Sequence, residues 1–157
     1  GEGITTYVDC LGKETFPLEG QNVGLSGSAL GIPSGKGANP ALSARYVQID
    51  KDSDIILVFG GSNDWGQTEF PCDLGDPDGT DTDRHTFCGA LRFLITTLRR
   101  EYPKALVVYA SPMHRNDYVW YPTIGKDPSE VFEFNRFGHS LVEYRTAALS
   151  ICKKADN

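Results

Sequence analysis

Two short segments, 54–60 and 105–110, each contain a run of apolar residues that is continuous rather than alternating. Such runs are typical of parallel strands that are buried on both faces. Between them, over about 83–102, apolar residues recur every three or four positions along one stripe, which predicts an amphipathic helix. Pro103 ends this helix, because proline has no amide hydrogen for the helical ladder and its ring clashes with the preceding turn.

A second helix is predicted over about 141–154, where Ser140 and Glu143 form the S-x-x-E capping box that begins many helices. Three shorter elements are expected before the first strand: the end of a helix at 6–13, a strand at 21–25 and a short helix from Pro40. Strands that alternate with helices predict an α/β domain with a parallel sheet. Right-handed crossovers then place helices on both faces of that sheet.

Ligands of such sheets bind beyond the carboxyl ends of the strands. The loops that follow the predicted strands, at 25–39, 60–82 and 111–138, are therefore where we expect functional residues. Two of these loops begin with short polar and glycine-containing segments. Segment 22–27 has the sequence Asn-Val-Gly-Leu-Ser-Gly, and segment 61–64 has the sequence Gly-Ser-Asn-Asp.

Together, these segments resemble the second and third sequence blocks of the SGNH, or GDSL-type, esterase and acylhydrolase family. The second block of that family is an N-x-G-x-S-G-like turn, and the third is G-x-N-D. Residues 54–65, 86–102 and 108–115 are also similar to the middle of bacterial members. The resemblance implies a three-layer α/β/α, flavodoxin-like fold with a parallel sheet. It also implies hydrolysis of a small-molecule ester without a cofactor or a metal.

By this resemblance, Gly27 and Asn63 form an oxyanion hole. Attack on an ester carbonyl develops negative charge on its oxygen, and one preorganised donor stabilises that charge by roughly 3–4 kcal/mol. Glycine lets its backbone N–H approach the substrate closely, and the Asn63 amide supplies a second donor. The alternative interpretations are an ordinary turn glycine and a turn or capping asparagine. The residues that would flank the substrate are Ser26, Asp64, Trp65 and His114.

The chain also departs from the family pattern. The family's nucleophile stands in a first block, Gly-Asp-Ser, and its catalytic Asp and His share a late Asp-x-x-His block; neither occurs in 1–157. The opening Gly1-Glu2-Gly3 would put a glycine at the nucleophile position, and Asn22 follows it too closely for the family's spacing. We therefore expect the first strand and the serine to precede Gly1. Residues 1–157 would then form a single domain of this type, incomplete at both ends and inactive by itself.

The three histidines do not replace the missing block. His85 and His139 stand at predicted helix starts, where surface or capping roles are the simplest interpretation. His114 follows the second strand and would line the cleft, but no aspartate stands three residues before it. The loop aromatics would suit a sugar-bearing or acyl substrate, or would simply pack within their loops. These aromatics are Trp65, Tyr118, Trp120 and Tyr121.

Composition and charge exclude several other classes of protein. The 21 acidic and 15 basic residues give a net charge of −6, so the chain lacks the basic surface that nucleic acid or anionic lipid would require. No apolar run reaches the roughly 18 residues of a membrane span. With 39% hydrophobic residues and periodic segments, the chain is not a disordered one. The acidic segment 76–83 lacks the glycine and glutamate positions of an EF-hand, so it predicts a solvated loop.

The four cysteines, Cys10, Cys72, Cys88 and Cys152, are far apart and form no C-x-x-C pair. This spacing argues against a zinc site. Buried or free thiols are the simplest expectation, and a Cys72–Cys88 bridge that closes the acidic loop is the alternative.

Two functional interpretations stay open. The first is the central part of an ester hydrolase that acts by nucleophilic acyl transfer. The second is a ligand-binding domain that keeps the fold without the catalytic residues. A nucleotide-binding domain is disfavoured, because no Walker A motif and no G-x-G-x-x-G follows a strand. Segment 24–28 is not a G-x-S-x-G nucleophile elbow either, because its fifth residue is serine.

Overall fold

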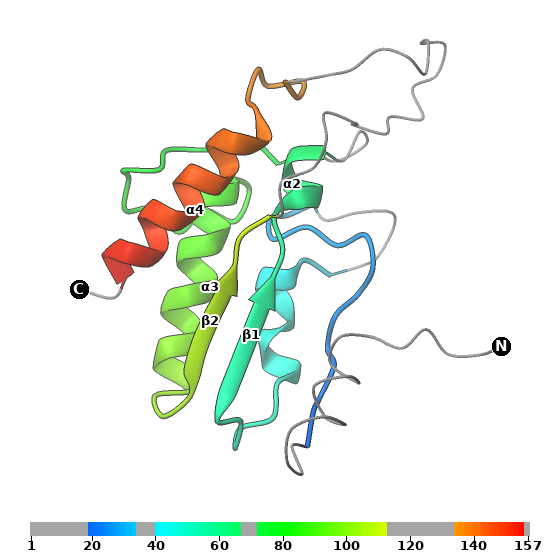
Figure 1. Ribbon diagram of the computed structural model, residues 1–157, viewed down its shortest axis with the longest axis vertical. Helices are drawn as coiled ribbons and strands as arrows, with labels where there is room; N and C mark the ends of the chain where they lie inside the picture. Colours follow the sequence, from blue (N-terminus) through cyan, green and yellow to red (C-terminus); the bar gives the residue numbers. More distant parts are fainter. Residues whose placement is uncertain (1–18, 34–39, 67–71, 113–133, 156–157) are drawn as a thin grey trace, which may run out of the picture.

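The computed structural model describes residues 19–33, 40–66, 72–112 and 134–155. These segments contain six helices and strands in a mixed α/β arrangement (Figure 1). In chain order they are the 3₁₀ helix η1 (Leu42–Gln48), strand β1 (Ile55–Phe59), helix α2 (Ser62–Gly66), helix α3 (Phe87–Glu101), strand β2 (Leu106–Ala110) and helix α4 (Leu141–Ala155).

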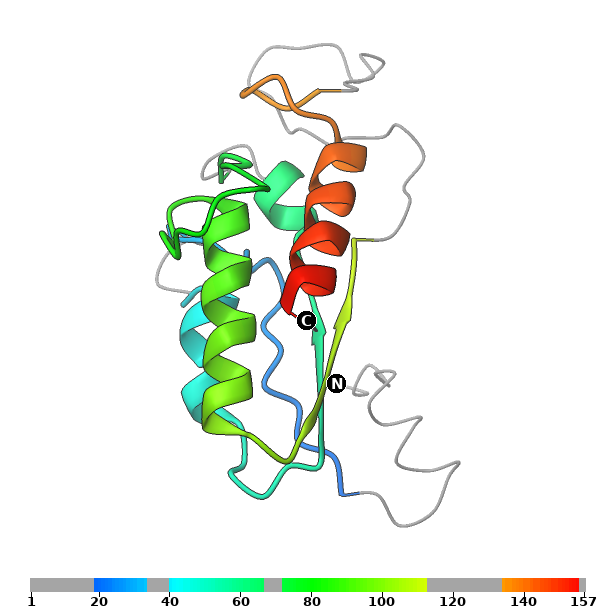
Figure 2. The same cartoon turned by 90° about the vertical axis from the view of Figure 1, so that its left-hand side faces the viewer.

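The two strands are neighbours in a parallel sheet, in a register that runs from Ile55 opposite Leu106 to Phe59 opposite Ala110. Helix α3 lies between them in the sequence and runs alongside both in space (Figure 2). The predicted pair of parallel strands with an intervening amphipathic helix is therefore confirmed. Since β1 ends at Phe59, the Gly-Ser-Asn-Asp segment begins just beyond the carboxyl end of that strand.

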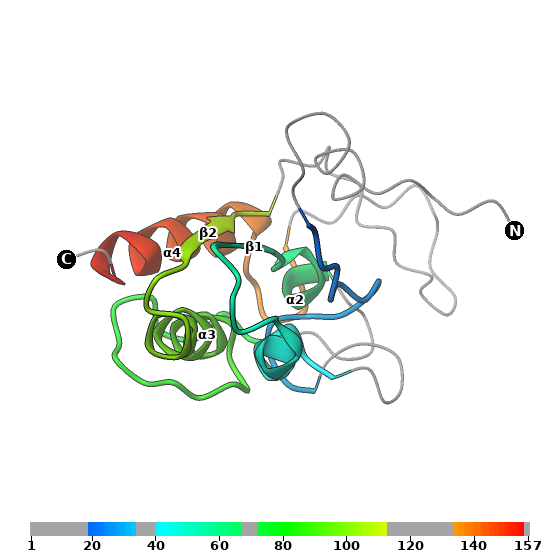
Figure 3. The same ribbon diagram turned by 90° about the horizontal axis from the view of Figure 1, so that it is seen from below.

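Helix α3 lies at the centre of the hydrophobic core. The apolar stripe predicted from the sequence is buried: Phe87, Ala90, Leu91, Leu94, Ile95 and Leu98. This helix packs against α4 and η1, and η1 and α3 lie on the same side of the two strands (Figure 3). The Tyr102 hydroxyl lies within hydrogen-bond distance of two carbonyl oxygens, those of Tyr46 (3.0 Å) and Ile49 (2.9 Å), which share its single hydrogen. The core thus fixes the position of η1, which borders the candidate site.

The expectation that both strands are buried on both faces is wrong. Along β1 the burial alternates: Ile56 is 5% exposed, whereas Ile55 is 62% exposed. Leu57, Phe59, Leu106 and Val108 are exposed large apolar residues on the same two strands. The reason is that α3 and η1 cover one face of the sheet, and no helix or strand in the described segments buries the other.

The predicted strand at 21–25 is not formed. Instead, the Asn22 side chain accepts a hydrogen bond from the Gly24 backbone N–H at 2.9 Å, and such a local bond turns the chain rather than extending it. The Gln21 side chain donates to the Gln48 carbonyl (3.0 Å) and accepts from the Asp50 N–H (2.9 Å). These bonds fasten the segment to the end of η1 instead of to a sheet.

The helix boundaries show where local chemistry overrides periodicity. Helix α3 begins at Phe87 rather than near Asp83, because Asp83 Oδ1 accepts the His85 N–H (3.0 Å) and Thr86 takes the N-cap position. The Ser140–Glu143 capping box of α4 is confirmed, with Ser140 N–H donating to Glu143 Oε2 at 2.7 Å and Glu143 N–H donating to Ser140 Oγ at 3.3 Å.

Three further sequence expectations have different outcomes. Helix α2 falls in a segment predicted as loop, because five residues are too few for a periodic pattern. The short helix expected from Pro40 is the 3₁₀ helix η1. The helix expected at 6–13 lies outside the described residues.

Cys72 and Cys88 are both buried and free, so the bridge considered for them is not formed. The Cys72 thiol donates to the His85 carbonyl at 3.2 Å. Burial raises the pKa of the Cys72 thiol, and it raises the pKa of Cys88 to about 11. Both groups are therefore neutral thiols at physiological pH rather than reactive thiolates.

Candidate functional site

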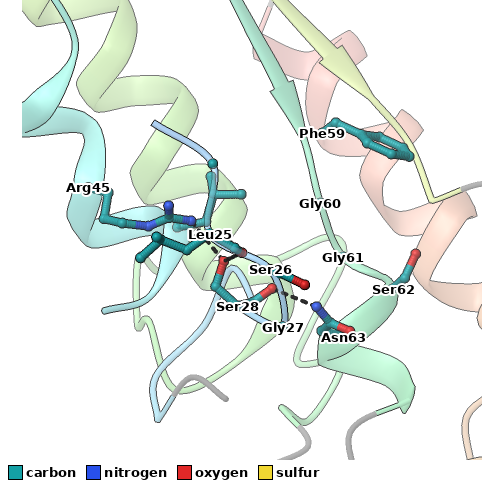
Figure 4. A pocket seen from close by; sticks show the side chains of 12 residues that line it. Leu25, Ser26, Gly27, Ser28, Arg45, Phe59, Gly60, Gly61, Ser62 and Asn63 are labelled. Carbon is teal, nitrogen blue, oxygen red and sulfur yellow. Dashed lines mark hydrogen bonds between the residues drawn. The ribbon is translucent and has the colours of Figure 1, made fainter. Parts of the chain in front are cut away.

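A cavity of about 240 Å³ lies beyond the carboxyl end of β1 (Figure 4). Its lining residues come from three places: the turn at 24–28, helix η1, and the segment that leads from β1 into α2. They are Gly24, Leu25, Ser26, Gly27, Ser28, Leu42, Arg45, Phe59, Gly60, Gly61, Ser62 and Asn63. The cavity therefore lies where ligands of a parallel sheet are expected to bind.

The first wall is a tight turn from Leu25 to Ser28. The Ser28 N–H donates to the Leu25 carbonyl (3.3 Å), and the Ser28 hydroxyl donates to the same oxygen (2.8 Å). Gly27 has a φ of +78°, which fits the third position of a type II turn and favours glycine there. A Cβ on Gly27 would meet no atom within 4 Å, so its α-carbon borders open space.

The second wall is the sharp change of direction from β1 into α2. Gly61 allows it with a φ of +112°, and a Cβ there would come within 2.9 Å of both Phe87 and Pro112. Asn63, in the first turn of α2, donates its Nδ2 hydrogen bond to the Ser28 carbonyl at 2.9 Å. An amide nitrogen carries two hydrogens, so the same group can also donate to a ligand oxygen.

The structure therefore brings the turn of Gly27 and the side chain of Asn63 to one cavity, from segments more than 30 residues apart. Their role as oxyanion donors stays a prediction. Ser26 also lines this cavity. His114, Tyr118, Trp120 and Tyr121 lie outside the described residues.

Asp64 and Trp65 have structural contacts instead of lining the cavity. The Asp64 carboxylate is fully buried and accepts the backbone N–H groups of Leu30 and Gly31, each at 2.9 Å. Trp65 is buried, and its indole N–H donates to the His139 carbonyl at 2.8 Å. Burial raises the pKa of Asp64 from 3.8 to about 6, against the opposing effect of the backbone hydrogen bonds. Both side chains hold α2, and with it Asn63, against the rest of the fold.

Arg45 is a lining residue that sequence reasoning missed. Its guanidinium donates to the Val23 carbonyl through Nη1 and to Ser28 Oγ through Nη2 at 2.8 Å. Burial lowers the pKa of this group below its usual value. The sequence contained one indication: a charged residue stands inside the apolar run of the predicted helix after Pro40.

The two histidines of the described segments, His85 and His139, do not line the cavity. His85 Nδ1 is 2.8 Å from Asp83 Oδ1, and His139 Nδ1 is 3.0 Å from Glu143 Oε1. Within the segments that the structure describes, no three His, Cys, Asp or Glu side chains come together as a metal ion would require. None of the helices in this part of the chain is both long and apolar enough to cross a membrane.

Comparison with known proteins adds to this geometry. No family model and no curated protein matches the sequence. A structural-genomics target from Lactobacillus plantarum is 30% identical and superposes with a TM-score of 0.74, over 99% of this chain and 67% of the other. The chain belongs to the family of this Lactobacillus protein.

Two further solved structures are similar to this chain. One is 29% identical, with a TM-score of 0.62 over 83% of this chain and 54% of the other. The other is a candidate GDSL-like lipase from Bacteroides uniformis, 23% identical, with a TM-score of 0.51 over 83% of this chain and 50% of its own length. At 23% identity the likeness concerns the fold alone. The chain spans about two thirds of the Lactobacillus protein and about half of the other two.

Proposed function

We propose that this chain is the central part of an SGNH-type serine esterase, which cleaves a small-molecule ester by nucleophilic acyl transfer. The observation that carries the proposal is the meeting of the Gly27 turn and the Asn63 amide in one cavity beyond β1. The fold shared with the Bacteroides GDSL-like lipase supports it. In the complete three-layer α/β/α sheet of that fold, further strands would lie beside β1 and β2.

The proposed reaction begins with a serine hydroxyl of the native-length protein, the longer protein of which this chain would be the central part. A histidine of that protein takes the hydroxyl proton as the serine attacks and returns it to the departing alcohol. The serine oxygen attacks the ester carbonyl carbon, and the carbonyl π electrons move onto the carbonyl oxygen. The Gly27 N–H and the Asn63 amide donate hydrogen bonds to that oxyanion. Collapse of the tetrahedral intermediate expels the alcohol, and water then hydrolyses the acyl-serine. Ser26 and His114 are proposed to contact the substrate.

The experiment is hydrolysis of p-nitrophenyl acetate by the native-length protein. Asn63→Ala should lower kcat roughly 10²–10³-fold, the usual loss for one oxyanion donor. KM should change little, because the donor acts on charge that develops only in the transition state. The matched control is Gln21→Ala, which removes another amide that bonds two segments together but lies outside the cavity; its kcat should stay at the native value.

Two outcomes would contradict the proposal. Absence of turnover by the native-length protein would favour the alternative, a ligand-binding domain without the catalytic residues. Vigorous hydrolysis by residues 1–157 alone, abolished by Ser26→Ala or His114→Ala, would show that the nucleophile or the base lies inside this chain. We expect residues 1–157 alone to have almost no activity, because removal of a triad nucleophile costs several orders of magnitude.

A further inference from the structure

Arg45 is a buried cation without an acidic partner among the described residues. Only 3% of its surface is exposed. Its two bonded nitrogens, Nη1 and Nη2, donate to neutral oxygens, the Val23 carbonyl and the Ser28 hydroxyl. No group in the described segments accepts a hydrogen bond from its buried Nε. A guanidinium taken out of water loses much hydration energy, and neutral acceptors replace only part of it.

Two other arginines of the described segments, Arg92 and Arg100, have carboxylate neighbours. Arg92 Nη1 is 3.5 Å from Asp81 Oδ2, and Arg100 Nε is 3.1 Å from Glu101 Oε1. Arg92 is the closest parallel to Arg45, because it also donates to loop carbonyls, those of Asp76 and Asp81. Arg45 differs from it in two respects: it has no anion beside it in this part of the chain, and it lines the candidate site.

Arg45 and Asn63 hold the same turn from opposite sides (Figure 4). The Arg45 guanidinium bonds to the Ser28 hydroxyl, and the Asn63 amide bonds to the Ser28 carbonyl. The turn that contains Gly27 therefore has two external supports in addition to its internal hydrogen bonds. The positive charge of Arg45 lies directly behind this turn, in a buried environment where charges are poorly screened.

We propose that Arg45 is a positioning residue that holds the turn at 25–28, and that its uncompensated charge makes this cavity select small oxyanions over neutral ligands of the same shape. The chemical class is a carboxylate or a tetrahedral oxyanion. This deepens the proposed function, on which its meaning for catalysis rests, since an ester reaction passes through a tetrahedral oxyanion and releases a carboxylate. Arg45 acts through Ser28 and through its electric field rather than by touching the ligand.

The test compares acetate with acetamide, which has nearly the same shape but no charge. Binding of each to the native-length protein is followed by the NMR resonances of the Gly27 amide and the Asn63 side chain. The wild-type protein should bind acetate at least tenfold more tightly than acetamide. Arg45→Gln should bring this ratio close to one, whereas the control Arg92→Gln should leave it unchanged, because Arg92 already faces Asp81 and lies outside the cavity.

A wild-type protein that does not discriminate between the two probes, or binds neither, would overturn the inference. So would an Arg45→Gln protein that keeps the tenfold preference. If Arg45→Gln fails to fold, Arg45→Lys decides, because an ammonium keeps the charge but cannot reproduce the fork of two donors. Arg45→Lys should retain the preference for acetate and lower kcat about tenfold at unchanged KM; loss of the preference would overturn the inference.

The proposed esterase function and the proposed role of Arg45 can fail independently of each other. If Asn63→Ala leaves hydrolysis unchanged, the esterase proposal fails, while the ratio of acetate to acetamide binding still decides the role of Arg45.

Discussion

The Asp64 carboxyl group is buried, and its hydrogen bonds hold two segments of the fold together. It accepts the N–H groups of Leu30 and Gly31, which follow the turn at 25–28, and so it joins that stretch to α2. The two hydrogen bonds favour the ionised form, but burial disfavours it more strongly and raises the pKa of this group to about 6. Folding should therefore become less favourable as Asp64 ionises.

The first prediction is a pH dependence of stability that originates at Asp64. The folded-state pKa, about 6, lies above the usual 3.8, so the folded protein holds the proton more tightly than the unfolded chain does. The contribution of Asp64 to the free energy of unfolding should then be fully present below about pH 4 and fall by up to about 3 kcal/mol as the pH rises through 6. Urea unfolding of the native-length protein between pH 4.5 and 7 measures this slope.

Asp64→Asn supplies the control, because the amide does not titrate and the slope should disappear. Other carboxylates have the opposite effect in a different window. Partners lower the pKa of Asp78, Asp83, Glu101 and Glu143, so their stabilisation is lost only as the pH falls below about 4. A slope between pH 4.5 and 6 that Asp64→Asn leaves unchanged would contradict the assignment.

At the scale of residues, the sequence predicted that Gly27 and Asn63 lie at one site, but it did not predict the structural contacts of Asp64 and Trp65. The meeting of Gly27 and Asn63 was predictable from the two sequence blocks that resemble the SGNH family, although the strand expected before Gly27 is not formed. Asp64 and Trp65, next to Asn63 in the sequence, point into the protein rather than into the cavity. The short helix α2 sends neighbouring side chains in different directions, and sequence adjacency does not reveal this. Arg45 could be recognised only once η1 was placed beside the turn.

At the scale of elements, the start of α3 provides the second prediction. Thr86 caps this helix, its Oγ1 accepting the Gly89 N–H at 3.1 Å. Thr86→Ala removes that acceptor and should lower the free energy of unfolding by about 1 kcal/mol. Thr96→Ala is the matched control on the same helix: Thr96 is exposed in its interior, where alanine has the higher helix propensity.

Thermal or urea unfolding of the two variants measures the difference. Thr96→Ala should leave stability unchanged or raise it slightly. Equal destabilisation by both substitutions would show that the Thr86 cap does not contribute.

Strand β1 provides the third prediction, from two neighbouring isoleucines on opposite faces. Ile56 is buried against the core, and Ile55 is exposed. Ile56→Ala should cost about 2–5 kcal/mol, through lost burial and the cavity left behind. Ile55→Ala should cost less than about 1 kcal/mol, because it loses mainly β propensity. Urea unfolding of the native-length protein separates the two, and a large cost for Ile55→Ala would mean that another segment covers that face.

The helices and strands differ in how far the sequence determined them. Helix α3 and α4 were predictable because each has a long apolar stripe or a capping pair. The continuous apolar runs predicted both strands but not their one-sided burial, since the periodicity of a strand does not say which neighbours cover it. The segment at 21–25 failed as a strand because the Asn22 side chain bonds to its own backbone, which is a local alternative to sheet pairing.

At the scale of the whole molecule, the parallel sheet has one face covered by α3 and η1 and a second face, called here the uncovered face, that no helix or strand of the described segments covers. On the uncovered face, five large apolar side chains are exposed on β1 and β2: Ile55, Leu57, Phe59, Leu106 and Val108. Contiguous apolar surface of this kind marks interaction or aggregation. A sheet of two strands is also small for an independent domain. Both features agree with a chain that spans only part of the length of its structural relatives.

The fourth prediction is that residues 1–157 by themselves are marginally folded or poorly soluble. The apolar side chains of the uncovered face stay in contact with water, so they add little to the free energy of unfolding. The same side chains favour association between molecules. Circular dichroism should give a broad, low-temperature transition for 1–157 and a sharp one for the native-length protein, and light scattering should detect aggregates of the former.

Ile55→Thr combined with Leu106→Thr should reduce this scattering without lowering the transition temperature, because both side chains are already exposed. Ile56→Thr, on the covered face, should lower that temperature instead. A sharp, cooperative transition of soluble 1–157 would contradict the prediction, because it would show that the described fold is sufficient without further strands.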